Sequence, residues 1–159
     1  TIYRRYENKT KLFYAVIRWK YNQFTNRYRQ APKFGEELAF LKDLLRNLVD
    51  YALDPESLRL TKVSIGESER FPDIIQQVFV GTSTGLATIV EDILFRLVNR
   101  GELRIADPVA MARQIFHFVA ADMTLLHLTG LSPFDTRDKR DRHFEDRWNA
   151  FLFTYQGKP

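Results

Sequence analysis

Residues 108–129 are apolar on nearly every face, and this segment constrains the fold more than any other part of the chain. Asp107 and Pro108 precede its first turn as a cap and a first-turn proline, and Gly130 follows as a stop signal. A helix without a polar face must be covered on almost all sides. In a chain of 159 residues, a second subunit is a natural source of part of that cover, and a monomeric core is the competing interpretation.

The rest of the chain also divides into segments with helical periodicity. It holds only 7 Gly and 6 Pro and few alternating apolar and polar residues, which favours helices over a sheet. The predicted helices cover residues 9–29, 34–53, 55–70, 72–100 and 108–129, and a sixth follows the charged residues 137–142. We therefore predict an all-α fold, a helical bundle.

Three of the predicted helices have local features that bear on packing. The second is expected to begin its buried stripe at Phe34. In the third, the face that contains Ile65 is small and hydroxylated, so it either borders a cavity or packs closely on another helix. In the fourth, Gly81 and Gly85 each cost about 1 kcal/mol in a helix interior. We expect a weakened or kinked turn at these glycines, or a close approach of another helix.

The N-terminal end of the chain is basic and aromatic. Residues 1–33 hold nine Lys or Arg against one acid, a net charge of +8, whereas the remaining residues sum to −4. Hydroxyl, guanidinium and aromatic groups occur together in residues 3–6, and that chemistry suits a phosphate backbone. A basic patch at one end is typical of a nucleic-acid contact, and a solvated basic helix is the alternative.

The order of the residues in this segment resembles the TetR family of bacterial transcriptional regulators. Thr-Ile-Tyr-Arg-Arg-Tyr at residues 1–6 and Asn-Lys-Thr-Lys-Leu-Phe-Tyr-Ala-Val at residues 8–16 are similar to the end of that family's recognition helix and the start of its connecting helix. A second similarity lies at residues 58–73, where an acid-rich helix end precedes Arg-Phe-Pro, as in the AcrR-like branch of the family.

The resemblance implies three regions in the chain. Residues 1–8 would be the remnant of a helix-turn-helix DNA-binding domain, residues 9–32 a connecting helix, and residues 33–159 an effector-binding and dimerisation domain. Roughly forty residues would complete the DNA-binding head. We interpret the chain as a fragment, or as the ordered part of a longer protein.

The same resemblance implies a function. It suggests a cytoplasmic, homodimeric repressor that binds a palindromic operator through its complete heads and is released by a small hydrophobic effector in the helical core. Its predicted DNA-binding residues are Thr1, Tyr3, Arg4, Tyr6 and Lys9. The alternative function is a helical dimerisation or adaptor module with no role in ligand or DNA binding.

Periodicity and bulk select the remaining candidate residues. The predicted effector-binding residues are Ile65, Phe79, Phe116, Phe118 and Met123. The last two predicted helices of two subunits would form a four-helix interface, for which the predicted residues are Leu125, Leu128, Phe144, Trp148, Phe151, Leu152 and Tyr155.

The sequence contains no recognisable catalytic constellation. It has no Cys, which fits a reducing cytoplasm and excludes a thiol nucleophile. His117 and His127 are ten residues apart, which is not metal-ligand spacing, and no Gly-x-Ser-x-Gly motif occurs. No eighteen apolar residues follow one another without interruption, which argues against a membrane span. We expect neither an enzyme nor a cofactor, a metal or a membrane contact.

Overall fold

The computed structural model describes residues 9–28, 30, 32–70 and 72–157, and gives only the backbone of residues 9, 10, 73–75 and 77–84. Its α-helices are α1 (Lys9–Thr25), α2 (Glu37–Leu53), α3 (Pro55–Gly66), α4 (Pro72–Asn99), α5 (Pro108–Thr129) and α6 (Arg137–Tyr155). A 3-10 helix, η2 (Asn26–Tyr28), follows α1. The all-α prediction is confirmed.

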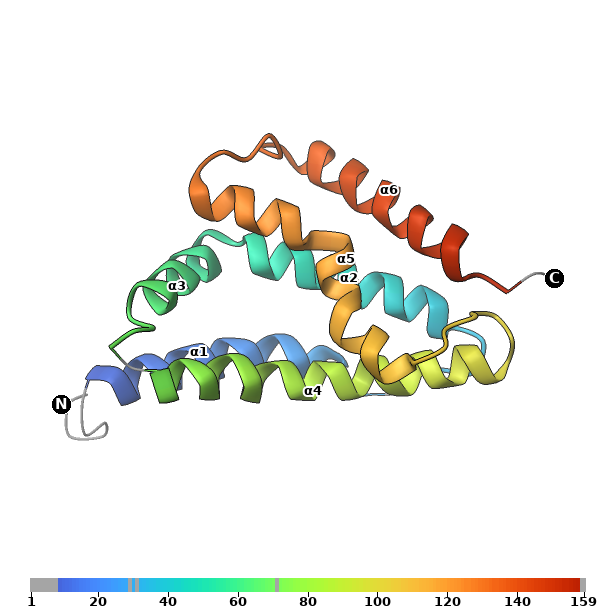
Figure 1. The fold of residues 1–159 in the computed structure, drawn as a ribbon, viewed down its shortest axis with the longest axis horizontal. Helices are drawn as coiled ribbons and strands as arrows, with labels where there is room; N and C mark the ends of the chain where they lie inside the picture. Colours follow the sequence, from blue (N-terminus) through green and yellow to red (C-terminus); the bar gives the residue numbers. More distant parts are fainter. Residues whose placement is uncertain (1–8, 29, 31, 71, 158–159) are drawn as a thin grey trace.

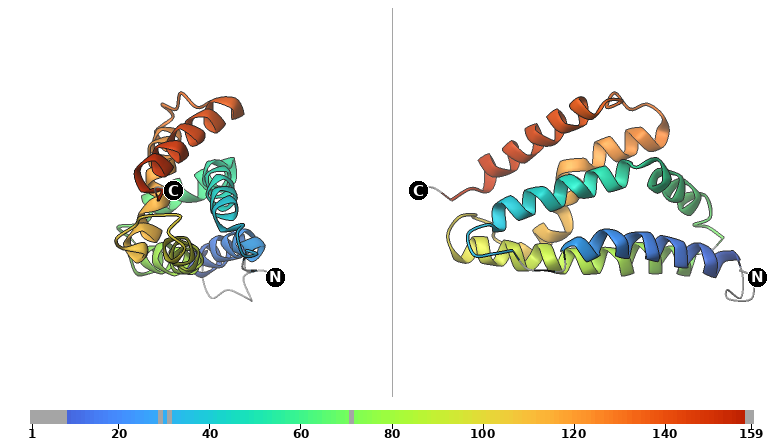
Figure 2. Two further views of the ribbon diagram at one scale, coloured as in Figure 1. Left: turned by 90° about the vertical axis from the view of Figure 1, so that its right-hand side faces the viewer. Right: turned by 180° about the vertical axis from the view of Figure 1, so that it is seen from behind.

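The helices are arranged around α5. Figure 1 shows α1 and α4 side by side along one long edge, with α6 on the opposite edge and α2 between them. The two further views in Figure 2 agree with this arrangement. Helix α5 starts beside α4, bends midway and continues beside α6, and it also contacts α2. The first turn of α1 therefore lies at one end of an elongated bundle.

Local capping chemistry sets several helix boundaries where the sequence predicts them. The Asp54 side chain accepts a hydrogen bond from the Ser57 amide at 3.1 Å, and Pro55 occupies the first turn of α3. In the same way, Asp107 accepts from the amide of Ala110 at the start of α5. Gly130 ends α5 in the left-handed conformation, with a φ of 76°.

The start of α2 differs from the prediction, because Phe34 is not the first residue of the buried stripe. Phe34 is 86% exposed and lies outside the helix, whereas Glu37 is 1% exposed. The backbone turns at Gly35, which has a φ of 87° and donates its amide to the Glu37 carboxylate. The buried acid is neutralised by Arg100, the first residue after α4, whose guanidinium donates to both carboxylate oxygens at 2.7 and 2.8 Å.

The apolar core lies where α2, α4, α5 and α6 meet. Its largest fully buried apolar side chains are Leu41, Leu44, Leu45, Ile93, Leu94, Leu97, Leu103, Ile115, Met123, Phe144 and Phe151. The segment after α6 is hydrogen-bonded to the α4–α5 loop, since the amide of Gly157 donates to the carbonyl of Glu102 at 2.9 Å. A side chain at Gly157 would overlap the carbonyl oxygen of Gly101, so the tail lies directly on the α4–α5 loop.

The helix α4 is continuous through the glycine-containing segment at residues 81–85. Gly85 is exposed, and a Cβ atom placed on it would meet nothing within 4 Å. The close helix approach considered for this segment is therefore absent at Gly85.

We expect Gly85→Ala to raise the free energy of unfolding by about 1 kcal/mol, because alanine loses less backbone entropy in a helix. In thermal denaturation this corresponds to a rise in Tm of roughly 2–4 °C. Gly130→Ala is the matched control and should lower Tm, since its left-handed φ is strained for alanine. A lower Tm for Gly85→Ala would show that this position is not an ordinary helix interior.

Candidate functional site

The connecting helix α1 is tied to the turn between α2 and α3 by one lysine. The Nζ atom of Lys20 donates to Asp54 Oδ2 at 2.7 Å and to Glu56 Oε2 at 2.6 Å, and the Lys20 side chain is only 14% exposed. The hydrogen bond from Lys20 holds the pKa of the Asp54 carboxyl below its usual range. Asp54 also caps α3, so Lys20 joins α1 to the start of α3.

An aromatic cluster lies between α1 and α2. The Phe24 ring lies 5.4 Å from that of Tyr28 and 5.0 Å from that of Tyr51, and Phe40 meets Tyr28 edge-on at 5.6 Å. These rings pack as tilted and edge-on pairs and form an apolar cluster on the inner side of α1, close to the core.

Tyr21 packs beside this cluster, and its hydroxyl is the position at which a ligand could make a polar contact. The hydroxyl oxygen is buried and lies near the backbone of Leu86 in α4, but no described residue makes a hydrogen bond of good geometry to it. A buried hydroxyl without a partner is unfavourable by roughly 1–3 kcal/mol. Burial raises the pKa of Tyr21 to about 12, so at neutral pH the group keeps its proton and can donate it. Sequence periodicity could have found Tyr21, because it follows Ile17 by four residues and precedes Phe24 by three.

The predicted effector-binding residues whose side chains are described differ in burial. Met123 is fully buried and Phe116 packs against the core, whereas Ile65 and Phe118 are exposed. Of Phe79 only the backbone in α4 is described. As a binding set, these residues stay a prediction.

The hydroxyl groups of Thr61 and Ser64 in α3, and of Ser68 just after it, bond to nearby backbone carbonyls. Thr61 donates to the carbonyl of Ser57, Ser64 to that of Leu60 and Ser68 to that of Ile65, all within 2.9 Å. The small hydroxylated face predicted for this helix therefore uses its hydrogen-bonding capacity locally.

The predicted DNA contacts fall almost entirely outside the part of the chain that the structure describes. Thr1, Tyr3, Arg4 and Tyr6 lie outside the described residues, and Lys9 opens α1 with only its backbone described. These DNA contacts remain predictions.

The aromatic stripe of α6 faces the core of its own chain. Phe144, Trp148 and Phe151 are buried there. Leu128, Leu152 and Tyr155 are partly buried, and Leu125 is exposed. Helical spacing identified the apolar face of α6 without indicating which subunit covers it. Phe153 was missed because it lies on the opposite side of the helix.

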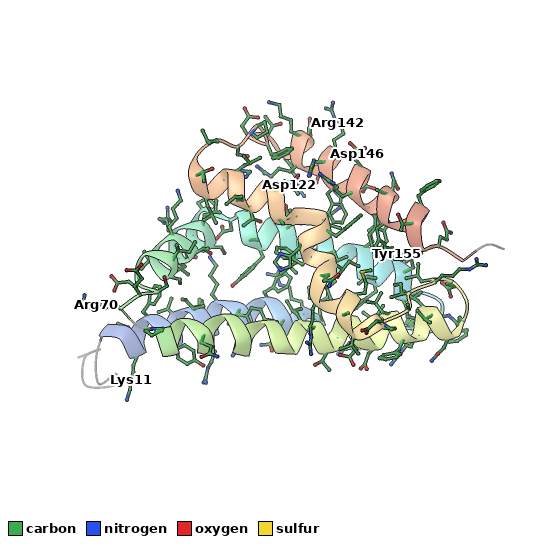
Figure 3. The ribbon with its side chains drawn as sticks, in the orientation of Figure 1. Lys11, Arg70, Asp122, Arg142, Asp146 and Tyr155 are labelled. Carbon is green, nitrogen blue, oxygen red and sulfur yellow. The ribbon has the colours of Figure 1, made fainter. Side chains whose placement is uncertain are left out.

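Ion pairs hold α6 on both flanks. Towards α5, the Asp122 carboxylate accepts from His143 Nε2 at 3.1 Å and from Arg147 at 3.3 Å. Burial alone would raise the pKa of Asp122, but the hydrogen bond from His143 and the nearby charges outweigh it and lower the pKa. Figure 3 shows Asp122 on α5 below α6, and Arg142 on the outer side of α6.

On the other flank, α6 is joined to α2. Lys42 donates to Glu145 at 2.7 Å, and Arg46 pairs with Asp141 at 2.9 Å and with Glu145. The Arg46 guanidinium also lies over the Phe144 ring at 4.9 Å. Ion pairs occupy both flanks of α6 and the core covers its inner face. The outer face of α6 is therefore the one exposed to solvent.

A shallow groove opens to solvent at the turn between α5 and α6. It is lined by Pro133, Phe134, Lys139, Arg142, His143 and Asp146. The groove carries charges of both signs, and Lys139 is already paired with Asp135 at 2.7 Å. Among the described residues, no group of three or more His, Asp or Glu side chains could hold a metal ion.

Comparison with known proteins connects this geometry with one family. Residues 39–157 match the family model described as AefR-like transcriptional repressor, C-terminal domain. No curated protein sequence matches the chain.

Three solved structures share the fold. A putative TetR-family transcriptional regulator from Mesorhizobium loti MAFF303099 is 21% identical with a TM-score of 0.78, and the match covers 98% of this chain and 79% of that one. The flavonoid-responsive regulator FrrA is 22% identical with a TM-score of 0.75, covering 99% and 80%. A TetR transcriptional regulator from Agrobacterium tumefaciens is 19% identical with a TM-score of 0.68, covering 99% and 77%.

Proposed function

Because the chain belongs to the TetR family of transcriptional regulators, we propose that it is the effector-binding and dimerisation part of a ligand-responsive repressor. In this proposal the complete protein binds a palindromic operator as a homodimer, and a small hydrophobic effector in the helical core releases it. The observation that carries the proposal is that two neighbouring residues of α1 could couple a ligand to the position of this helix. Lys20 fixes α1 to the α2–α3 turn, and Tyr21 presents a buried hydroxyl that has no side-chain partner among the described residues.

The Lys20 ion pairs and the adjacent Tyr21 hydroxyl suggest how an effector could act on the DNA-binding head. A ligand that accepts a hydrogen bond from Tyr21 would bind directly to the helix that leads to the head. It would shift the position of α1 only if it bound one position more tightly than the other. Major-groove half-sites recur at about 34 Å, so a small change in head spacing is enough to weaken operator binding.

The aromatic cluster beside Tyr21 favours an apolar effector that carries a hydrogen-bond acceptor. A flavonoid has that chemistry, and the flavonoid-responsive regulator FrrA has the same fold, so flavonoids are a reasonable first set of probes. The proposed test uses the full-length protein. Operator selection from random DNA should enrich a palindrome, and probe addition should then release the labelled operator in a fluorescence anisotropy titration. Failure to enrich any palindrome would contradict the proposed function.

For the Tyr21→Phe variant we expect effector affinity to fall roughly three- to tenfold, because one hydrogen bond contributes about 0.5–1.5 kcal/mol. Operator affinity without effector should stay at the wild-type value, since the hydroxyl has no side-chain partner among the described residues. Isothermal titration calorimetry with the releasing probe measures the first quantity, and anisotropy measures the second. Tyr28→Phe is the matched control, because its hydroxyl already donates to Asp43 at 3.3 Å. Equal effector affinity in wild type and Tyr21→Phe would exclude this hydroxyl as the contact.

The homodimer is supported by the surface of α5. Within the described residues, α5 is the one helix long and apolar enough to cross a membrane by length and composition, and only 28% of its most apolar window is buried. Asp122 lies near the middle of this helix and is paired with His143 and Arg147 of α6. A charged residue at that depth is unfavourable in a bilayer. We therefore assign the cover of α5 to a second copy of the chain, in a cytoplasmic protein.

A further inference from the structure

Helix α5 is not straight, and side-chain hydrogen bonds to its own backbone occur in its second half. Figure 1 shows that α5 starts beside α4, bends midway and continues beside α6. The amide of Met123 donates to the Asp122 carboxylate at 2.9 Å, and the Thr124 hydroxyl donates to the carbonyl of Ala120 at 3.1 Å. Side chains that bond to the backbone inside a helix disturb its regular hydrogen bonding and bend it. We therefore attribute the bend to the polar side chains of this part of α5.

Asp122 also fixes α6 to this second half of α5. While it binds the Met123 amide, its carboxylate accepts from His143 Nε2 at 3.1 Å and from Arg147 at 3.3 Å. The two helices are also joined along the chain by the turn at residues 130–136. We therefore expect α6 to move together with the second half of α5, and the Asp122 carboxylate is the first of two clamps on this pair of helices.

The second clamp lies at the other end of α6, where the chain returns to the segment that precedes α5. The amide of Arg104 donates to the carbonyl of Tyr155 at 2.6 Å. The amide of Gly157 donates to the carbonyl of Glu102 at 2.9 Å, and a Cβ atom at Gly157 would overlap the backbone of Gly101. Residues 155–157, which we call the C-terminal strap, therefore hold the end of α6 to the loop from which the first half of α5 starts.

The two clamps act on the same bend from its two sides. Asp122 joins α6 to the second half of α5, and the C-terminal strap joins α6 to the start of the first half. A change in the angle between the two halves therefore requires one of the clamps to open. We propose that Asp122 and the C-terminal strap together form a lock that fixes the bend of α5. With both clamps closed, α5 and α6 move as one unit, and the opening of either clamp frees α5 to flex.

Amide hydrogen exchange of the full-length protein tests the lock with two variants and their combination. Gly157→Ala displaces the C-terminal strap, because the added Cβ atom has no space there. Asp122→Ala removes the carboxylate that joins Met123 to α6. Gly66→Ala is the matched control, since a Cβ atom at that glycine meets nothing within 4 Å. Mass spectrometry follows the amides of residues 115–120, a stretch of α5 that contains neither substitution.

We expect residues 115–120 to exchange roughly tenfold faster than wild type in Gly157→Ala and in Asp122→Ala, and at the wild-type rate in Gly66→Ala. The double variant should exchange no faster than the faster single variant, because one open clamp already frees the bend.

Independent effects at two distant sites would instead add, and additive acceleration in the double variant would overturn the lock. Faster exchange confined to the residues next to each substitution would also overturn it. The amides of residues 41–45 in the core helix α2 are the internal reference. Equal acceleration there would reveal a general loss of stability, and the lock would again be wrong.

Discussion

Full-length protein with Lys20→Met is expected to bind its operator roughly tenfold more weakly than wild type, within the usual range of coupling between two sites. Lys20 pairs α1 with Asp54 in the α2–α3 turn and with Glu56 in the first turn of α3, and both of its partners are within 2.7 Å. Without the ammonium group, α1 can take up positions in which the two heads no longer match the half-site spacing. Fluorescence anisotropy with the selected operator measures the change.

Lys42→Met is the matched control for this prediction. Lys42 pairs with Glu145 at 2.7 Å, but this contact joins α2 to α6 and leaves α1 untouched. We expect the control to lose a similar small amount of thermal stability and to keep wild-type operator affinity. If both variants lose operator affinity equally, the effect of Lys20 is a general loss of stability, and the proposed role of this contact is wrong.

The largest loss of stability is expected from Glu37→Gln, with a fall in Tm of roughly 10 °C. The Glu37 carboxylate is buried, accepts from the Gly35 amide and binds both terminal nitrogens of Arg100. An amide at this position cannot neutralise the guanidinium, so Arg100 would keep a positive charge beside a buried neutral group. Differential scanning calorimetry checks the change, and Glu102→Gln, which removes an exposed partner of the same arginine, serves as the control.

The same carboxylate predicts a pH dependence. The hydrogen bond from Arg100 lowers the pKa of Glu37 from 4.5 to about 2. Because the folded-state pKa lies below the unfolded value, the stabilisation is complete above pH 4.5 and is lost as the pH falls towards about 2. Glu37→Gln has no carboxyl to titrate, so its stability should fall less steeply than that of wild type over this interval. Urea titrations at pH 5, 4 and 3 give the free energy of unfolding of both proteins. If it falls equally with pH in wild type and in Glu37→Gln, the assignment is contradicted.

Features that depend on neighbouring residues were predicted well. Asp54, Asp107 and Gly130 act within one turn of their own position, so the start of α3 and both ends of α5 follow from the sequence, whereas α3 ends at Gly66 and not near Arg70. The start of α2 depends on Arg100, which lies 63 residues from Glu37 in the sequence. No local pattern signals such a partner, and helical spacing therefore placed Phe34 in the buried stripe.

The candidate site was harder to predict, for a related reason. Spacing separates the apolar side of a helix from its polar side, but it does not show which molecule covers that side. Phe144, Trp148 and Phe151 form a correct apolar stripe, yet they complete the core of their own chain. Lys20 is a candidate because it pairs with Asp54 outside its own helix, and Tyr21 is one because its buried hydroxyl has no side-chain partner among the described residues. Both emerge only once α1 lies against α2 and α4.

The attachment of the C-terminal tail to the α4–α5 loop has a practical consequence for following the protein in motion. Because Gly157 is hydrogen-bonded to Glu102 and lies directly on Gly101, the tail is a stationary landmark at the end of the bundle far from the start of α1. A fluorescent donor attached after this tail and an acceptor on the head would report the swing of α1 within one chain by energy transfer. Donors and acceptors on the two tails of a dimer would report only how the copies are seated. The two kinds of movement could then be timed separately.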